Sequence, residues 1–181
     1  VLRDLVLVAI YFLSLRLTSQ ASRLDNGFSW APMLEVAKLF AGIFITIAPA
    51  LAILRAGKDG ALAPLVALVT GPDGQPNDVW YFWLTGILSS FLDNAPTYLV
   101  FFNLAGGDPG VLMGALASTL AAISCGAVFM GANSYIGNAP NFMVKAVVEE
   151  AGIRMPSFFG YMAWSCGILL PLFVLLTVIF F

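Results

Sequence analysis

An all-α transmembrane fold is predicted by three features of this 181-residue sequence. Apolar residues make up 60% of the chain and charged residues 10%, whereas soluble domains are typically about 45–50% apolar and about 25% charged. The apolar residues form long solid runs rather than the alternating pattern of a β-barrel. Two of these runs are interrupted by Asn, Gly and Pro. Together these features exclude a soluble enzyme, a disordered chain and a nucleic-acid-binding protein.

The first 60 residues are expected to contain scaffold transmembrane helices. Leu5–Leu15 is a solid apolar run, although alone it is shorter than the about 20 residues that cross a bilayer. Thr18–Trp30 is polar and predicts a loop. Met33–Leu54 is long enough to cross, and Pro49 inside it predicts a kink. Residues 61–78 are expected to be a connecting segment and turn, because a short apolar stretch leads into residues rich in Gly, Pro and Asp.

A re-entrant helical hairpin is expected over residues 79–104. Val79–Asn103 is a run of 25 residues with a single charge, Asp93, near its middle. A helix from Val79 to Leu92 is about 21 Å long and one from Ala95 to Leu104 about 15 Å, so each is shorter than the about 30 Å hydrocarbon core. Two such helices that meet at a tip would enter and leave the membrane on the same side. One kinked span is the alternative.

A discontinuous helix is expected over residues 111–151. Val111–Val144 is 34 residues long without a charge, and the Gly, Asn and Pro in it argue against an unbroken helix. The predicted parts are a helix over Val111–Met130, a loop over Gly131–Ala139 and a short amphipathic helix to Ala151. Residues 155–181 contain no charge and are expected to form the final transmembrane helix.

The two interruptions carry the same short motif. Residues 90–98 read Ser-Phe-Leu-Asp-Asn-Ala-Pro-Thr-Tyr, and residues 134–142 read Ser-Tyr-Ile-Gly-Asn-Ala-Pro-Asn-Phe. An interrupted helix survives in lipid only where it is packed in protein or lines a wet cavity. Its free N–H groups attract anions and its free carbonyls bind Na⁺, so we expect the two motifs to face each other around a small-ion site. The predicted helix-break residues are Ala95, Pro96, Gly131, Gly137, Ala139 and Pro140.

Asp93 is the charge that most strongly indicates a function. Placing a charge at the bilayer centre costs from about 2.5 to more than 10 kcal/mol, so an intramembrane carboxylate is a functional hypothesis by default. It would ligate a cation, carry a proton, or do both in competition. The alternative is that Asp93 caps a half-helix that starts near Pro96, and the two roles are compatible.

At these two motifs the chain resembles the citrate transporters and sodium:proton antiporters of the ion transporter superfamily. The resemblance covers nearly the whole chain. It implies two inverted repeats, each with scaffold helices, a re-entrant hairpin and a broken transmembrane helix. This chain looks like the C-terminal repeat, and because it begins at Val1 rather than Met, it is expected to be part of a longer protein.

The resemblance also implies where ions and substrate bind. The hairpin tip and the unwound loop would together form one sodium site and part of the substrate site. The implied ion- or substrate-binding residues are Ser90, Asp93, Asn94 and Thr97 at the tip, and Asn133, Ser134, Asn138 and Asn141 at the loop. The expected Na⁺ ligands among them are Asp93, Asn94 and Asn138.

A secondary active transporter is therefore expected rather than an enzyme, since the chain has no His and no metal-binding cluster. A Na⁺/H⁺ antiporter that works by alternating access is the first hypothesis, with Na⁺ or H⁺ as the coupling ion and no other cofactor. Na⁺- or H⁺-coupled transport of citrate or another carboxylate is the alternative. Dicarboxylate carriers of the superfamily have Ser-Asn-Thr at such tips, whereas Asp93 would repel an anion unless a cation neutralised it.

The expected surroundings follow from the same hypothesis. The chain would be a multi-pass protein of the cell membrane, most simply the bacterial inner membrane. Its partners would be a small ion or carboxylate, the lipid bilayer and an N-terminal repeat in the same polypeptide, with a homodimer also allowed and no nucleic acid. A membrane-embedded enzyme and a purely structural membrane subunit are the remaining alternatives.

Overall fold

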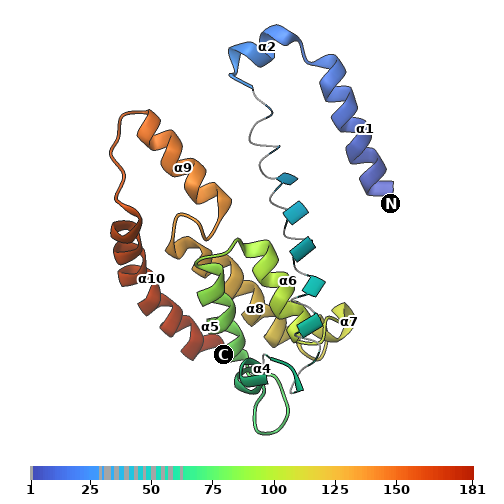
Figure 1. Cartoon of the computed structure of the whole chain (residues 1–181), viewed down its shortest axis with the longest axis vertical. Coiled ribbons are helices and arrows are strands. Elements are labelled where there is room, and N and C mark those ends of the chain that lie inside the picture. The colour runs from blue at the N-terminus through green and yellow to red at the C-terminus, as the bar shows by residue number, and fades with distance from the viewer. Residues whose placement is uncertain are drawn as a thin grey trace. The chain divides into compact units, whose positions relative to one another are not determined.

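The computed structural model describes residues 2–28, 30 and 63–181, together with residues 34, 37–38, 41–42, 45–46, 48–49, 52–53, 56 and 59–61. The regular structure of these residues is helical, apart from an isolated bridge between Thr70 and Pro76 (Figure 1). The all-α class is thereby confirmed for the described residues. The chain divides into two compact units, Val1–Gly42 and Ile43–Phe181.

The first unit contains α1 (Leu2–Leu17) and α2 (Gln20–Asp25). The loop predicted over Thr18–Trp30 is therefore wrong for the residues of α2. Ser19 explains the additional helix, because its hydroxyl accepts a hydrogen bond from the backbone N–H three residues later and caps the first turn. Half of the predicted span over Met33–Leu54 lies outside the described residues, and its described residues are helical.

The second unit begins with α4 (Ala63–Val69), and a turn then leads into α5 (Asp78–Ser89) and α6 (Asn94–Leu104). Asn77 and Asp93 start the last two helices, because each side chain accepts a hydrogen bond from a backbone N–H of the first turn. The two helices pack against each other on either side of a short turn (Figure 1). At 12 and 11 residues they are about 18 and 16 Å long, less than a bilayer's hydrocarbon core. Re-entry on one side of a membrane stays a prediction.

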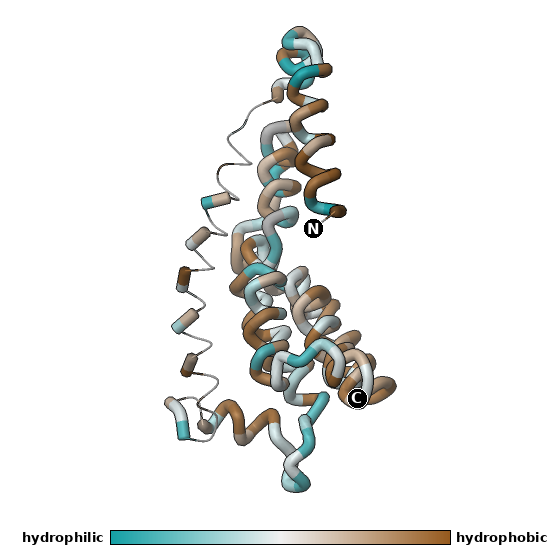
Figure 2. The backbone as a smooth tube through the Cα atoms, turned by 90° about the vertical axis from the view of Figure 1, so that its right-hand side faces the viewer, coloured by the Kyte–Doolittle hydropathy of each residue, from teal (hydrophilic) through white to brown (hydrophobic). Residues whose placement is uncertain are grey.

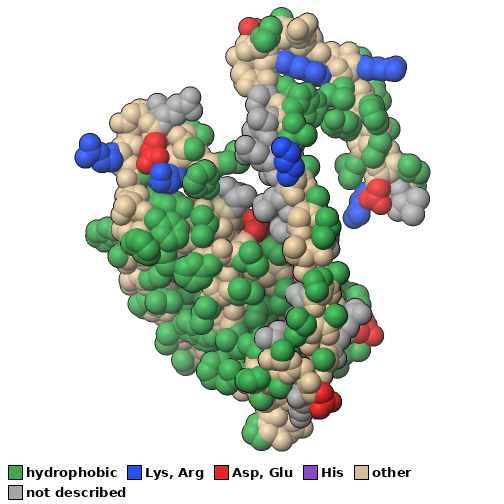
Figure 3. All heavy atoms as spheres, viewed as in Figure 1, with side chains coloured by type: hydrophobic (Ala, Val, Ile, Leu, Met, Phe, Trp, Pro, Cys, Tyr) green, Lys and Arg blue, Asp and Glu red, His purple; other side chains and the backbone are tan. Residues whose placement is uncertain are grey.

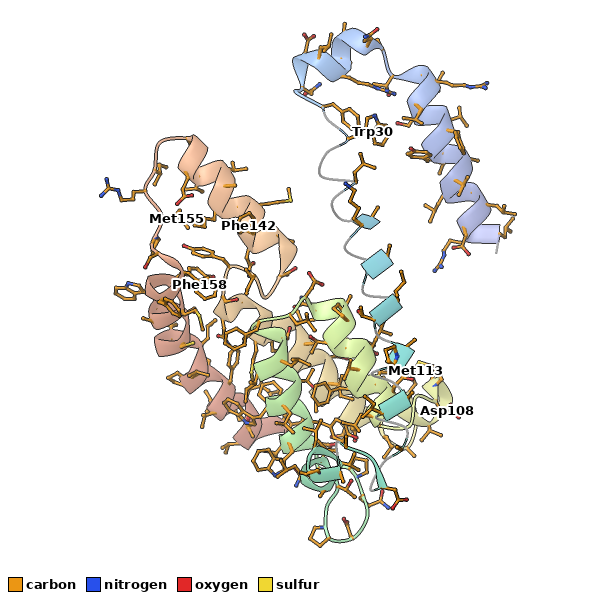
Figure 4. All side chains as sticks on the ribbon, viewed as in Figure 1. Trp30, Asp108, Met113, Phe142, Met155 and Phe158 are labelled. Atoms are coloured by element: carbon orange, nitrogen blue, oxygen red, sulfur yellow. The ribbon has the colours of Figure 1, made fainter. Side chains whose placement is uncertain are left out.

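The helix predicted over Val111–Met130 is in fact two helices, α7 (Pro109–Leu112) and α8 (Ala117–Met130). The Asp108 carboxylate accepts hydrogen bonds from two N–H groups of the following turn, so α7 begins before the predicted helix start. Figure 4 shows Asp108 and Met113 at the two ends of this short helix. A turn over residues 113–116 separates it from α8.

The C-terminal part of the second unit contains the second interruption. A 3₁₀ turn, η2 (Gly131–Asn133), extends α8, and a loop leads to α9 (Ala139–Glu150). The last helix, α10 (Phe158–Phe180), is capped by Ser157, whose hydroxyl accepts a hydrogen bond from Gly160 N at 3.2 Å. Among the described residues, α10 is the one helix both long and apolar enough to cross a membrane.

The centre of the second unit is the contact between α5 and α8, which begin at the same end. The carboxylate of Asp78, in the first turn of α5, accepts a hydrogen bond from the hydroxyl of Thr119, in the first turn of α8, at 2.6 Å. Further along, a Cβ on Gly126 would lie 2.4 Å from Phe82 O. Small residues allow helix backbones in membranes to approach this closely. The core around this contact contains Phe82, Ile123 and Met130.

Apolar side chains also cover much of the outside of the second unit. Figure 3 shows hydrophobic side chains over much of the visible face, with few charged ones among them. Figure 2 likewise shows hydrophilic residues gathered in the turn between α4 and α5. An exposed apolar surface of this kind indicates contact with a membrane or with another protein. On α10 the exposed large residues include Phe159, Trp164, Val178 and Phe180.

Asp78→Ala is expected to destabilise the second unit. The substitution leaves the hydroxyls of Ser118 and Thr119 without their common acceptor, which costs roughly 1.5–3 kcal/mol for hydrogen bonds to a charged group. Thermal unfolding of the protein in detergent measures the loss. Asp73→Ala is the control, because the exposed Asp73 carboxylate accepts only a local bond from Gln75 N in the described structure. Equal melting temperatures for the two variants would contradict the role given to Asp78.

Candidate functional site

The two helix interruptions lie directly against each other. At the end of α5, the Ser89 hydroxyl donates a hydrogen bond to Ala127 O of α8 at 2.5 Å. The Ser90 hydroxyl lies 2.9 Å from Gly86 O in its own helix and 3.0 Å from Met130 O at the end of α8. The carboxyl-terminal ends of the two helices therefore meet at one point, which we call the junction and define as residues 89–94 and 127–138.

Side chains from each interruption reach into the other. Asn133 Nδ2 donates to Ser90 Oγ at 3.0 Å, and Ser134 Oγ donates to Ser90 O at 2.5 Å. All three residues are buried. The Ser134 hydroxyl also accepts hydrogen bonds from the backbone N–H groups of Ile136 and Gly137, which shapes the loop before α9. Three of the predicted site residues, Ser90, Asn133 and Ser134, are thus brought together by direct contacts.

Two glycines make this approach sterically feasible. A Cβ on Gly137 would lie 2.5 Å from Gly131 O and 2.7 Å from Ser89 O, and both of these atoms belong to the backbone. A Cβ on Gly131 would lie 2.3 Å from the side-chain amide of Asn94. Real Cβ atoms do not occur at such distances, so these positions require glycine. Both predicted helix-break glycines therefore act as points of close backbone contact.

The amide of Asn94 lies between the two interruptions. One end of it faces Ala127 O at 2.8 Å, Gly137 O at 3.1 Å and Ser89 Oγ at 3.0 Å. The two carbonyls only accept hydrogen bonds, so the atom that faces them is the nitrogen. Ser89 Oγ completes the pattern by accepting from Asn94 while donating its own proton to the carbonyl of α8. Asn94 therefore joins the hairpin turn to both sides of the second interruption.

At the second interruption, side chains donate the hydrogen bonds that backbone N–H groups would donate in a continuous helix. In lipid, each carbonyl that lacks a helical partner needs another donor. The carbonyls of residues 131–134 each accept one from a side chain, and the donors come from two helices that follow the break. Asn141 Nδ2 of α9 donates to Gly131 O and Ser134 O at 3.0 Å each, Tyr161 OH of α10 to Ala132 O at 3.0 Å, and Ser165 Oγ of α10 to Asn133 O at 2.6 Å.

One buried polar atom at the junction has no hydrogen-bond partner. Asn133 Oδ1 is buried and unpaired, while the nitrogen of the same amide is bound to Ser90. Thr97 Oγ1 on α6 and Thr85 Oγ1 on α5 are buried and unpaired as well. Unpaired buried polar atoms are few in native proteins, and each calls for an explanation such as an ion or a water. Thr85 was not predicted from the sequence, because a Thr inside a helix carries no distinctive pattern.

The shared Asn-Ala-Pro motif starts a helix at both places. Asp93 is the N-cap of α6, with its carboxylate accepting a hydrogen bond from Ala95 N at 3.2 Å, and Pro96 lies in the first turn. The expectation that Asp93 caps a half-helix starting near Pro96 is thereby confirmed, with Asn94 as its first residue. A first-turn proline has no helical partner to lose, so it stabilises a helix start. Ala139 and Pro140 occupy the corresponding first turn of α9.

The remaining predicted residues differ in how closely they take part. Asp93 and Asn138 are both half-buried and lie within the junction, at the starts of α6 and α9. Asn141 contributes its amide nitrogen to two carbonyls and so supports the backbone. Thr97 is fully buried on α6. Their roles in ion or substrate binding stay predictions.

Comparison with protein families identifies the group to which this chain belongs. The family model described as "Putative citrate transport" matches residues 1–181. The chain belongs to this citrate-transport family. The resemblance drawn from the two Asn-Ala-Pro motifs is thereby confirmed. As a member of this family, the chain is a membrane transport protein. No curated protein and no solved structure matches it.

Proposed function

We propose that this chain is one repeat of a secondary active transporter and that its coupling cation binds at the junction. The observation that carries the proposal is the unpaired oxygen of Asn133, buried where the carboxyl-terminal ends of α5 and α8 meet. Helix carboxyl termini carry partial negative charge and attract cations. Carbonyl and side-chain oxygens at the unwound helices of transporters coordinate Na⁺.

The exchanged ions are Na⁺ and H⁺ in the first form of this proposal. The side chains that make hydrogen bonds at the junction are hydroxyls and amides, together with one carboxylate, that of Asp93. This composition suits a cation better than a carboxylate substrate. Na⁺ and H⁺ compete for Asp93, so the release of one accompanies the binding of the other. The hairpin and the broken helix move together against the scaffold helices to give alternating access.

Cation-coupled citrate transport is the second candidate, and the description of the family favours it. The first turns of α6 and α9 both start beside the junction and present backbone N–H groups. Such helix starts bind carboxylates. A cation bound near Asp93 would remove the repulsion between that carboxylate and citrate. The N-terminal repeat, which the proposal places in the same polypeptide, would supply the rest of the substrate site.

Flux measurements in proteoliposomes separate the two candidates. The purified protein is reconstituted with a pH-sensitive dye inside. An inward Na⁺ gradient, or in separate runs an inward H⁺ gradient, is applied with and without radiolabelled citrate outside. Antiport predicts Na⁺-driven proton release from the lumen in the absence of citrate. Cotransport predicts citrate uptake that requires the Na⁺ or H⁺ gradient. If neither ion gradient drives proton movement or citrate uptake above protein-free vesicles, secondary transport by this protein is refuted.

A further inference from the structure

The last helix contributes two donors to the interrupted backbone. Tyr161 and Ser165 lie one turn apart on the same face of α10, because residues four positions apart are neighbours on a helix. They bind successive carbonyls of the 3₁₀ turn, Ala132 O at 3.0 Å and Asn133 O at 2.6 Å. The sequence predicted α10 only as a final transmembrane helix, with no part in the site.

Ser165 binds across to the loop in preference to its own helix. A serine in a helix commonly donates to a carbonyl of its own preceding turn. Here Ser165 Oγ is 3.2 Å from Met162 O but 2.6 Å from Asn133 O, and the hydroxyl has one proton to donate. The shorter contact therefore takes the proton, and the hydroxyl fixes the main chain of the residue that carries the unpaired oxygen.

Tyr161 has a second contact that holds the same loop. Its ring stacks on the ring of Tyr135, with centroids 4.2 Å apart and an interplanar angle of 26°. The Tyr135 hydroxyl in turn donates to Pro156 O, just before α10, at 3.1 Å. Residues 132–135 are thus attached to the start of α10 by two hydrogen bonds from α10, one hydrogen bond to Pro156 and one aromatic pair. Figure 4 shows Phe158, in the first turn of α10, at this same end of the helix.

We propose that Ser165 is a positioning residue that sets the affinity of the junction for its cation. The inference rests on the proposed function, since it takes Asn133 Oδ1 as a cation ligand. Ser165 holds the Asn133 carbonyl, and Ser90 holds the nitrogen of the Asn133 amide. Because the backbone carbonyl and the side-chain nitrogen of Asn133 are both held, its side-chain oxygen Oδ1 has one direction in which to point. Without the Ser165 hydroxyl, the backbone carbonyl of Asn133 turns to find another donor, and Oδ1 moves away from the ion.

The test compares the Na⁺ dependence of transport in Ser165→Ala and Ser165→Thr. We expect Ser165→Ala to raise the Na⁺ concentration for half-maximal flux about tenfold while maximal flux falls less than about twofold, because the lost hydrogen bond positions an ion ligand and its loss weakens ion binding. Ser165→Thr keeps a hydroxyl and is expected to restore the wild-type Na⁺ dependence. Tyr161→Phe keeps the ring stacking but loses one donor, so it is expected to shift Na⁺ dependence in the same direction by a smaller factor.

Ser124→Ala is the matched control, because the Ser124 hydroxyl binds only Leu120 O of its own helix in the described structure. It is expected to leave the Na⁺ dependence unchanged. If the wild-type protein responds to Na⁺ and Ser165→Ala has the same half-maximal Na⁺ concentration, the inference about Ser165 is overturned and the proposed function is not. A fall in maximal flux that Ser165→Thr does not reverse would overturn the inference about Ser165 in the same way. No response to Na⁺ in the wild-type protein would overturn the proposed coupling to Na⁺ and this inference with it.

Discussion

Replacing Asp93 with Asn is expected to abolish Na⁺-driven proton exchange while the hairpin stays folded. Asn caps helices about as well as Asp, so the hydrogen bond from Ala95 N to the side chain at position 93 is retained. The substitution removes only the negative charge and the proton-binding group. We expect flux to fall at least about 100-fold, because proton coupling by this residue requires a group that titrates. The measurement is dye-reported proton movement in proteoliposomes under a Na⁺ gradient.

Asp93→Ala separates the charge of Asp93 from its capping role. This variant loses both, so it is expected to transport no better than Asp93→Asn and to unfold more easily by about 1 kcal/mol, the usual value of an N-cap. Thermal unfolding in detergent measures that difference. Wild-type exchange in the Asn variant would refute the coupling role of Asp93 and leave it as a helix cap. In that case only the Ala variant would differ from wild type, and only in stability.

Gly137→Ala is expected to separate the two interruptions and eliminate transport. The new methyl group would lie 2.5 Å from Gly131 O and 2.7 Å from Ser89 O, and neither backbone atom can rotate away as a side chain would. The hairpin turn and the loop must therefore move apart, which breaks the hydrogen bond from Ser134 Oγ to Ser90 O. We expect a loss of stability of about 3 kcal/mol, towards the upper end for overpacking in a dense core.

Gly167→Ala provides the matched control for that substitution. Gly167 lies within α10, and a Cβ added there meets nothing within 4 Å. Ala is favoured over Gly inside a helix by about 0.5–1 kcal/mol, so this variant is expected to be as stable as wild type or more so. Melting temperature and ion flux are measured for both variants side by side. If Gly137→Ala matches Gly167→Ala in both measurements, the close packing of the junction is wrong.

The pairing of the two interruptions was the part of the site that the sequence could predict. Proline and asparagine inside apolar runs are unusual enough to mark a helix break, and the repeated motif linked one break to the other. The residues that contact across the junction, such as Ser90 and Asn133, lie within or beside that motif. The donors from α10 could not be predicted. Ser165 and Asn133 are 32 positions apart, and a serine in an apolar helix has the same local pattern whether it binds its own helix or another.

Two errors in the predicted elements arose from capping side chains. Periodicity and hydropathy gave a loop before Trp30 and one continuous helix from Val111, whereas the structure has α2 in the first place and a break after α7 in the second. In each case a short polar side chain, Ser19 or Asp108, accepts backbone hydrogen bonds and starts a helix of only 4–6 residues. Such local hydrogen bonds outweigh the apolar pattern over short distances. The long final helix, by contrast, follows directly from its uncharged sequence.

The attachment of the broken backbone to α10 has a consequence for biogenesis. Residues 131–134 leave the ribosome about 30 residues before Ser165, and at about 5–20 residues per second the gap lasts seconds. Until the last helix arrives, the carbonyls of Ala132 and Asn133 lack the donors that they have in the finished protein. A nascent chain that stopped before Tyr161 would have to keep this segment beside water or inside the insertion machinery. If α8 also crosses the membrane as proposed, the final helix completes the integration of an earlier one, and we expect quality-control proteases to recognise C-terminal truncations as unassembled.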